Sequence, residues 1–379
     1  MDGKQATKTI TFITPTLDRK GSEIALVNLL QQMNTSFQIK LIAKYKGVLF
    51  DLVLKSVNKA FLFDGKPKRT YYHRIKARLA IKARMQLLLG AEADSVFYIN
   101  TIILPDVLAF AQQKKIKTIV HIHELEQMYT QLNLLQIQRL VAYPDLIIAN
   151  SKASAAVIGN YGRRENVEIC YPSLNTENIK PDKKSRDTYR KKLNIADDAF
   201  LWVMSGSLDK NKNPFLFIDI AGEILKAKSN VKFMWIGGTV DTSFGKLCKD
   251  KTVEGKLSDS VIWLGDVAEE YYGYMNCADG FVLTSEKESF SLVTVEALLL
   301  GLPMVTQNCG GVKEILQNDI GKIVEEKNDA ERMAVEMMKF MGGEYKVDKE
   351  KQTERAKQFD AVAIGKHWND ILERYFNKG

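Results

Sequence analysis

The chain has 379 residues, which is more than one hydrophobic core usually serves, so we expect two domains. Its content of 45% hydrophobic and 26% charged residues is ordinary for a globular protein. No apolar run approaches 18 residues, and the first residues lack the apolar stretch of a secretory signal, so we expect neither a membrane-spanning helix nor export. The four cysteines lie far apart without metal-ligand spacing, which indicates reduced thiols in a cytoplasmic protein.

The net charge of +8 suits a nucleic acid, an anionic membrane surface or an anionic small molecule as partner. Zinc-finger spacing, aromatic ribonucleoprotein motifs and basic heptads are all missing, so we expect no nucleic-acid partner. Residues 66–84 hold eight Lys or Arg and no acid, beside a stripe of Tyr71, Ile75 and Leu79. Such a helix can bind anionic lipid, and it can equally be a solvated surface helix; the sequence leaves both open.

In the first half of the chain, apolar β-branched runs predict strands at 9–14, 38–43, 95–100, 118–122, 145–150 and 167–171. A helix is expected at 23–33, after a loop that contains Gly21. The run His121-Ile-His123-Glu124 ends the strand at 118–122. Two histidines at this spacing share one face of a strand and could bind a metal, but a third ligand is not apparent, so a hydrogen-bonding role is favoured for His121.

In the second half, strands are expected at 200–205, 231–236, 261–264, 280–284 and 303–306, and helices at 213–227, 290–300 and 330–341. Continuous apolar strands that alternate with helices are typical of parallel sheets covered on both faces, which predicts an α/β fold of two Rossmann-like domains. Their ligands should bind at the carboxyl ends of the strands. The polar stretch 175–198 is the expected domain boundary.

The most informative segment is Glu288-Ser-Phe-Ser-Leu-Val-Thr-Val-Glu296, which is followed by Gly301-Leu-Pro303. A strand comes before it, so it is expected to form a turn that opens a helix, with backbone N–H groups free to bind phosphate. Gly301 stands where a helix C-cap belongs. Eight residues rise about 12 Å along a helix, so the two carboxylates suit the ends of an elongated ligand such as a nucleotide sugar. The alternative is an amphipathic helix with two solvated glutamates.

This segment, together with Gly310-Gly311-Val-Lys-Glu314, resembles the signature of family-four retaining glycosyltransferases of the GT-B fold, whose two Rossmann-like domains face each other across a cleft. The resemblance implies that Glu288 contacts the transferred sugar and that Glu296 contacts the ribose. It implies that the backbone between them holds the diphosphate. It further implies an N-terminal acceptor domain (1–175), a donor domain (176–357) and a terminal helix (358–379) that can pack back on the first domain.

The same resemblance assigns roles to other strand ends. Gly206 and Lys212 match the family's diphosphate loop, but Ser207 stands where an arginine is usual, so Lys210 or Arg19 is a candidate to compensate. Gly21 matches the first loop, and His123 matches a histidine that contacts the donor sugar. Gly237 and Val267 end strands that flank the nucleobase in the family, while Trp235 and Trp263 are expected in the core. The complete set of expected site residues is His123, Glu288 and Lys212 for catalysis, and Gly21, Gly206, Ser207, Lys212, Gly237, Val267, Glu288, Ser289, Phe290, Ser291, Leu292 and Glu296 for donor binding.

The resemblance implies transfer of a hexose from a nucleotide sugar, with UDP-glucose or a related UDP-sugar first, to a glycan or lipid-linked acceptor in polysaccharide biosynthesis. The sequence has no Asp-x-Asp motif, so we expect no metal and no cofactor besides the donor. With the basic segment 66–84, this suggests a cytoplasmic protein at the inner face of the cell membrane. A sugar-nucleotide epimerase of the same fold and a non-catalytic nucleotide-sugar-binding subunit remain as alternatives. A dehydrogenase is disfavoured because no Gly-x-Gly-x-x-Gly follows the first strand.

Overall fold

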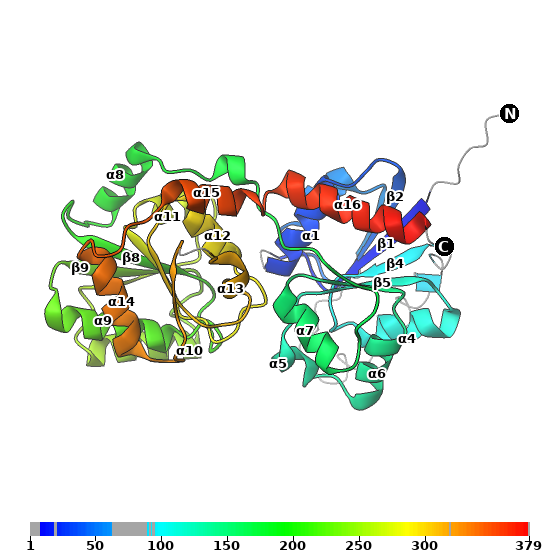
Figure 1. The fold of residues 1–379 in the computed structure, drawn as a ribbon, viewed down its shortest axis with the longest axis horizontal. Helices are drawn as coiled ribbons and strands as arrows, with labels where there is room; N and C mark the ends of the chain where they lie inside the picture. Colours follow the sequence, from blue (N-terminus) through cyan, green and yellow to red (C-terminus); the bar gives the residue numbers. More distant parts are fainter. Residues whose placement is uncertain are drawn as a thin grey trace. The chain divides into compact units, whose positions relative to one another are not determined.

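The computed structural model describes residues 8–18, 21–62, 89, 90, 92, 95–317 and 320–377. The chain divides into two compact units: unit 1 comprises residues 1–174 and 360–379, and unit 2 comprises residues 175–359 (Figure 1). The basic segment 66–84 and Arg19 lie outside the described residues. None of the described helices combines the length and hydropathy that a membrane-spanning segment needs.

Unit 1 contains a parallel sheet of seven strands in the order β3-β2-β1-β4-β5-β6-β7. The strands are β1 (Lys8–Thr14), β2 (Phe37–Ala43), β3 (Lys59–Leu62), β4 (Val96–Ile99), β5 (Thr118–Ile122), β6 (Leu146–Ala149) and β7 (Val167–Ile169). The helices described in this unit are α1 (Gly21–Gln31), α2 (Phe50–Val53), α4 (Pro105–Lys114), α5 (Glu126–Tyr129), α6 (Leu134–Ala142), α7 (Lys152–Asn160) and α16 (Ala361–Asn377), with a 3₁₀ turn at Leu54–Ser56. The strand order reverses direction at β1 and β4, as in a Rossmann fold.

Unit 2 repeats this arrangement with six parallel strands in the order β10-β9-β8-β11-β12-β13. The strands are β8 (Phe200–Ser205), β9 (Val231–Ile236), β10 (Val261–Gly265), β11 (Gly280–Leu283), β12 (Met304–Gln307) and β13 (Lys322–Val324). The helices are α8 (Lys183–Lys192), α9 (Pro214–Ala227), α10 (Ser243–Glu254), α11 (Tyr271–Asn276), α12 (Leu292–Leu299), α13 (Val312–Ile315), α14 (Ala330–Met341) and α15 (Lys349–Lys357), with a 3₁₀ turn at Thr176–Asn178. The prediction of two Rossmann-like sheets is confirmed.

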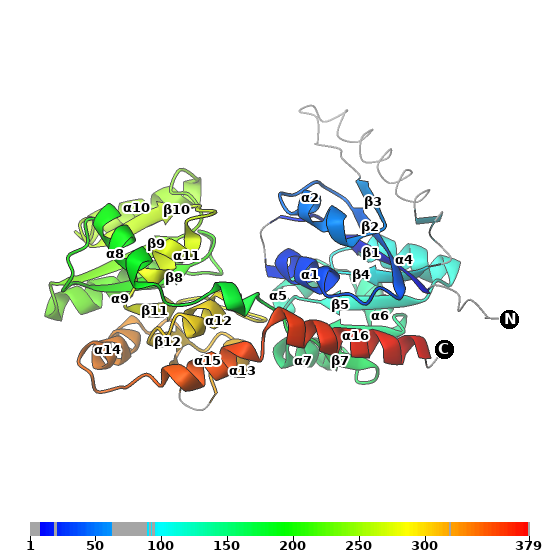
Figure 2. The ribbon, with the colours of Figure 1, turned by 90° about the horizontal axis from the view of Figure 1, so that it is seen from above.

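The C-terminal helix α16 packs within unit 1, alongside α1 (Figure 2). Trp368 is fully buried there, with its ring 5.9 Å from that of Phe12 and its Nε1 donating to the Tyr98 hydroxyl at 3.1 Å. Asn369 donates to the carbonyl of Gln32, the residue after α1, at 2.7 Å. The terminal amphipathic helix therefore completes the core of the unit in which the chain begins.

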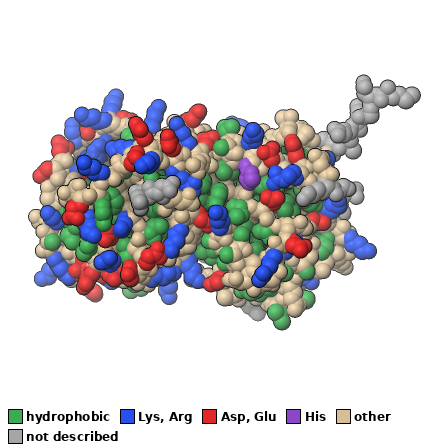
Figure 3. Space-filling view, in the orientation of Figure 1, with side chains coloured by type: hydrophobic (Ala, Val, Ile, Leu, Met, Phe, Trp, Pro, Cys, Tyr) green, Lys and Arg blue, Asp and Glu red, His purple; other side chains and the backbone are tan. Residues whose placement is uncertain are grey.

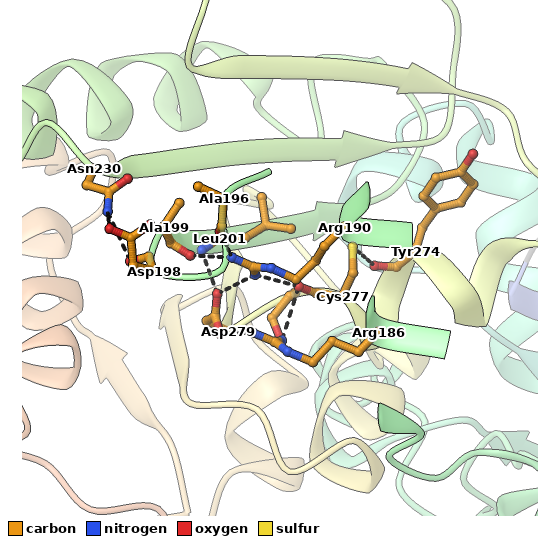
Figure 4. Close-up of polar contacts among 11 residues, drawn as sticks. Arg186, Arg190, Ala196, Asp198, Ala199, Leu201, Asn230, Tyr274, Cys277 and Asp279 are labelled. Carbon is orange, nitrogen blue, oxygen red and sulfur yellow. Dashed lines mark hydrogen bonds and ion pairs between the residues drawn. The ribbon is translucent and has the colours of Figure 1, made fainter. Parts of the chain in front are cut away.

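Helix α8 lies inside the polar stretch 175–198, which the sequence suggested only as a boundary. Its residues are polar apart from Tyr189, so no apolar periodicity marks it, but tertiary contacts hold it in place (Figure 4). Arg190, 2% exposed, donates to Asp279 at 2.9 Å and to the carbonyls of Ala196 and Ala199 at 2.6 Å. Arg186 donates to the other oxygen of Asp279 at 2.6 Å. These ion pairs fasten α8 beside the start of β11.

Two edge strands, β3 and β13, were not among the predicted strands because each is short and carries lysine at an exposed position. On the face drawn in Figure 3, basic and acidic side chains are interspersed over unit 2 and form no single-signed patch.

Candidate functional site

The switch point of the unit 2 sheet brings two loops together. Strands β8 and β11 are neighbours in the sheet, so the loops at their carboxyl ends, 206–213 and 284–291, meet at one edge. The backbone N–H of Glu286 donates to the carbonyl of Asn211 at 2.7 Å, and the Asn211 side chain donates to the carbonyl of Lys287 at 2.9 Å. The two segments that the sequence singled out therefore form one hydrogen-bonded site.

Lys212 and Glu288 form an ion pair at this edge, with Nζ and Oε1 separated by 2.5 Å. The Glu288 residue is 8% exposed, so it is not a solvated surface glutamate. Burial disfavours the charged form of Lys212, but the attraction of Glu288 outweighs it and raises the lysine pKa. The stem of Lys212 lies against Gly206, where a Cβ atom would come within 3.1 Å of the lysine side chain. The pair is thus charged and tightly held.

Lys212 is positioned by the start of α9. Asn213 adopts φ of 52° and its side chain accepts from Leu216 N at 3.2 Å, while Pro214 occupies the first helical turn. This cap fixes the point at which the loop turns into the helix. Asp209 accepts from the backbone N–H of Lys212 at 3.0 Å and from the hydroxyl of Ser207 at 2.5 Å. The position where the family has arginine is therefore an exposed serine bonded to an aspartate.

Glu288 is held by the glycine pair that follows β12. Its N–H donates to the carbonyl of Cys309 at 2.6 Å, and its carbonyl accepts from Gly311 N at 2.8 Å. A Cβ atom at Gly311 would lie 2.0 Å from the carbonyl oxygen of Ser289, so only glycine permits this approach. The glycines thus set the path of the turn that carries the carboxylate.

Helix α12 begins after this turn. Ser291 stands at its N-cap, where its side chain accepts no hydrogen bond from a backbone N–H of the first turn; its Oγ instead accepts from the hydroxyl of Thr294 at 2.8 Å. The helix start consequently keeps backbone donors of the kind that bind phosphate. Phe290 is 7% exposed and Leu292 begins the helix. Gly301 has φ of 67° just past the helix end, as its expected C-cap position requires.

Glu296 lies inside α12 and is 7% exposed. Its Oε2 accepts from the Tyr271 hydroxyl at 2.7 Å and its Oε1 from the Tyr272 hydroxyl at 3.0 Å. Burial raises the pKa of this carboxyl to about 7, against the opposing effect of the two tyrosine hydrogen bonds. Both glutamates of the signature are therefore buried and bonded, which contradicts the alternative of two solvated side chains. Sequence reasoning missed the two tyrosines, although they follow the β10 end as an aromatic pair.

The remaining donor-site residues of unit 2 lie at the ends of β9 and β10. Gly237 has φ of 104°, and a Cβ atom there would lie 2.7 Å from the carbonyl of Gly206. Val267 is half-buried in the loop after β10. Trp235 is fully buried and packs on the partly buried Trp263 at 5.9 Å, in keeping with their expected place in the core.

In unit 1, His121 and His123 lie at the carboxyl end of β5 with ring centroids 4.1 Å apart. Nδ1 of His121 lies 2.8 Å from the Tyr98 hydroxyl, and Nε2 of His123 lies 2.9 Å from Oδ1 of Asn100. Burial lowers the pKa of His123 to about 3, so this imidazole is neutral at physiological pH. In the parts of the chain that the structure describes, no group of three or more His, Cys, Asp or Glu side chains is arranged to hold a metal ion.

Gly21 begins α1 at an exposed position, and a Cβ atom there would meet no described atom within 4 Å. The protein itself therefore does not require glycine at this point. His123 and Gly21 both belong to unit 1, and the other expected site residues belong to unit 2.

Comparisons with known proteins agree with this geometry. Residues 185–359 match the sequence model of the family described as glycosyl transferases group 1. A D-inositol 3-phosphate glycosyltransferase 1 of Catenulispora acidiphila is 26% identical over 205 residues, which is 52% of this chain and 48% of the relative. A lipopolysaccharide 1,2-N-acetylglucosaminetransferase of Salmonella typhimurium is 21% identical over 197 residues, half of each chain. The chain thus spans about half the length of the curated relatives it matches.

Among solved structures, Anabaena Alr3699/HepE in complex with UDP and glucose superposes with a TM-score of 0.82 at 19% identity, over 96% of this chain and 99% of the other. A sucrose-phosphate synthase from Thermosynechococcus elongatus gives a TM-score of 0.76 at 14% identity, over 98% of this chain and 100% of the other. These likenesses establish the fold over nearly the whole chain. The protein has the GT-B fold, and its residues 185–359 match the model of the family described as glycosyl transferases group 1.

Proposed function

We propose that the protein is a retaining glycosyltransferase that transfers a hexose from a nucleoside-diphosphate sugar to a glycan or lipid-linked acceptor. The observation that carries the proposal is the Lys212–Glu288 pair at the switch point of the unit 2 sheet. It places a cation for a diphosphate and a carboxylate for sugar hydroxyls next to each other, beside the start of α12. This is the arrangement that an elongated nucleotide sugar requires.

In the proposed reaction, Lys212 and the N-terminus of α12 bind the diphosphate and stabilise the charge that it gains as it leaves. Glu288 accepts hydrogen bonds from the transferred sugar, and Glu296 accepts them from the ribose. The bond between the anomeric carbon and the phosphate oxygen breaks while the acceptor hydroxyl attacks from the same face. The acceptor proton passes to the leaving phosphate, so the chain supplies no nucleophile and the proposal includes no metal.

The proposed donor is UDP-glucose or a related UDP-sugar. Support comes from the resemblance of the signature and from the UDP and glucose named for the structurally similar Anabaena protein. The relative named for D-inositol 3-phosphate supports a polyhydroxylated acceptor, and the relative named for lipopolysaccharide supports a glycan or lipid-linked acceptor in polysaccharide assembly. Carboxylate recognition of hydroxyls by Glu288 is compatible with glucose, galactose and N-acetylglucosamine.

A thermal-shift screen against UDP, GDP, ADP and their sugars tests donor binding. A ligand present at about 100 times its dissociation constant stabilises the folded state by about 2.7 kcal/mol. Product analysis with the selected donor, with and without glycan acceptors, then separates three outcomes. Sugar transfer supports the proposal, an isomerised donor indicates an epimerase, and a donor that binds but is neither transferred nor hydrolysed indicates a binding subunit.

We also propose that residues 66–84 bring the protein to an anionic membrane surface, on the strength of their eight cations. Each basic residue near such a surface contributes about 1 kcal/mol. Wild-type protein should sediment with anionic liposomes at low salt, and reversal of Arg74, Arg78 and Lys82 to Glu should abolish this while UDP binding persists. Wild-type protein that does not bind these liposomes would contradict the membrane proposal and leave two interpretations of the segment, a solvated helix or part of a polar acceptor site.

A further inference from the structure

The carboxyl group of Glu296 is held from one side by two consecutive tyrosines. Tyr271 and Tyr272 occupy the first turn of α11, with ring centroids 5.1 Å apart and planes at 69°. Each hydroxyl donates a hydrogen bond to a different carboxylate oxygen of Glu296, that of Tyr271 at 2.7 Å and that of Tyr272 at 3.0 Å. An ionised carboxylate offers about four acceptor sites, so two hydroxyls leave acceptor capacity on both oxygens.

Tyr271 also connects this carboxylate to the loop that carries Lys212. Its hydroxyl lies 3.1 Å from Oγ of Ser205, the last residue of β8. Gly206 follows directly and begins that loop. The tyrosine thus touches both Glu296 and the strand end from which the diphosphate loop starts.

We infer that Tyr271 and Tyr272 are positioning residues of the nucleotide site, which orient the carboxylate of Glu296 and stabilise its charge so that it can accept both vicinal hydroxyls of a ribose. The inference rests on the proposed function, because it takes a ribonucleoside diphosphate as the ligand. The tyrosines act through Glu296 and need not touch the ligand themselves.

Burial works against this role. It raises the pKa of Glu296, which is about 7 with both tyrosine hydrogen bonds in place, so without these bonds the carboxyl group would stay protonated to a higher pH. A protonated carboxyl group has less capacity to accept from two hydroxyls. The tyrosine hydrogen bonds favour the charged form and lower the pKa, which keeps the group available near neutrality.

The groups that face Glu296 from the elements packed against it are the hydroxyls of Tyr271 and Tyr272 on α11, with Ser205 on β8 beside Tyr271. Burial, together with the neighbouring Glu296 charge, raises the pKa of both tyrosines above the ordinary value. Both tyrosines therefore remain protonated hydrogen-bond donors from pH 5 to pH 9. Of the four side chains Tyr271, Tyr272, Ser205 and Glu296, only Glu296 titrates in this pH range.

The test compares Tyr271→Phe, Tyr272→Phe and the double variant with wild type by calorimetry with UDP at several pH values. The ratio of variant to wild-type dissociation constants at one pH cancels the protonation of UDP itself. We expect a ratio of about tenfold or more at pH 6.5 that falls at least about fivefold by pH 9, because the loss of each hydrogen bond raises the pKa of Glu296. A ratio that is the same at every pH would show a merely structural role and overturn the inference.

Tyr274→Phe is the matched control, since Tyr274 lies in the same helix but its ring packs on that of Tyr189, with the centroids 4.7 Å apart. The ratio of the dissociation constants for UDP of Tyr274→Phe and of wild type should stay near one at every pH. A second readout needs no nucleotide: carboxyl ¹³C titration of labelled glutamate, with the Glu296 signal assigned by its loss in Glu296→Gln. An unchanged titration in Tyr271→Phe overturns the inference. A wild-type protein that binds none of UDP, GDP or ADP overturns the proposed function, whatever the titration shows.

Discussion

Nζ of Lys212 lies 2.5 Å from Oε1 of Glu288, across 76 positions of sequence. Any diphosphate that binds Lys212 must share the lysine with this carboxylate or displace it. In the proposed donor site, the pair should therefore lower the affinity for a nucleoside diphosphate while it keeps both side chains in place for a donor that carries a sugar.

We therefore predict that Glu288→Gln binds UDP more tightly than wild type, by up to about tenfold, because Lys212 is released from its charged partner. Turnover should fall, since the sugar loses a charged acceptor worth roughly 1.5–3 kcal/mol. Calorimetry with UDP and steady-state kinetics measure the two effects. Glu286→Gln is the charge-matched control, because Glu286 accepts from Asn213 and does not pair with Lys212. If Glu288→Gln binds UDP more weakly than wild type while Glu286→Gln does not, the idea that Glu288 competes with the diphosphate for Lys212 is wrong.

A double-mutant cycle should reveal the strength of the same pair. Lys212→Met keeps the apolar stem against Gly206 but leaves the buried Glu288 unpaired, and breaking a buried pair costs about 3–5 kcal/mol. Lys212→Met combined with Glu288→Gln should recover much of that loss. Denaturant unfolding of the four proteins gives the coupling free energy, and additive losses would mean that the pair does not stabilise unit 2.

Glu296 should make the stability of unit 2 depend on pH. Its pKa is raised from 4.5 to about 7 in the folded protein, so its favourable contribution is complete below about pH 4.5 and is lost as the pH rises through about 7. Relative to wild type, Glu296→Gln should therefore gain up to about 3 kcal/mol in free energy of unfolding between pH 4.5 and pH 8. Urea unfolding at both pH values provides the measurement. A difference that stays constant with pH would refute the raised pKa.

The ion pairs of Arg186 and Arg190 with Asp279, which hold α8 in place, give a prediction that concerns stability alone. Arg190→Ala leaves Asp279 without its buried partner and frees two carbonyls, at an expected cost of about 3–5 kcal/mol. Arg186→Ala, whose side chain is 30% exposed, should cost about 1 kcal/mol or less. In a Trp368→Phe background, the other three tryptophans all report on unit 2 by fluorescence. Equal losses for the two arginines would contradict the assignment of the buried one as the main contact.

Gly21→Ala separates a structural from a ligand-related need for glycine. A Cβ atom there meets no described atom within 4 Å, so the free energy of unfolding should stay within about 0.5 kcal/mol of wild type. If the donor or acceptor approaches this backbone, turnover should nevertheless fall. Gly311→Ala is the contrasting case, because its Cβ would clash with the Ser289 carbonyl and must displace the Glu288 turn. Unchanged turnover in Gly21→Ala removes this residue from the site.

The local pattern of the sequence determined most of the fold. Apolar β-branched runs located eleven of the strands, because a parallel strand buried on both faces must be continuously apolar. The sequence pattern did not predict the edge strands β3 and β13, because they are short and partly exposed. Helix α8 was not predicted because its residues are polar apart from Tyr189, and the Arg190–Asp279 contact that holds it in place joins residues 89 positions apart.

For the site, the spacing from Glu288 to Glu296 and the strand before it were enough to place one carboxylate in a turn and the other inside the helix that follows. The hydrogen-bond and ion-pair partners of the two carboxylates could not be predicted from the sequence, because contacts between segments far apart in sequence form only once the sheet is assembled. The adjacency of β8 and β11 brings Lys212 to Glu288, and the packing of α11 against α12 brings Tyr271 and Tyr272 to Glu296. Sequence thus determined which groups are candidates to carry the chemistry, while the tertiary structure decided which charges are paired, since pairing depends on strand order and burial.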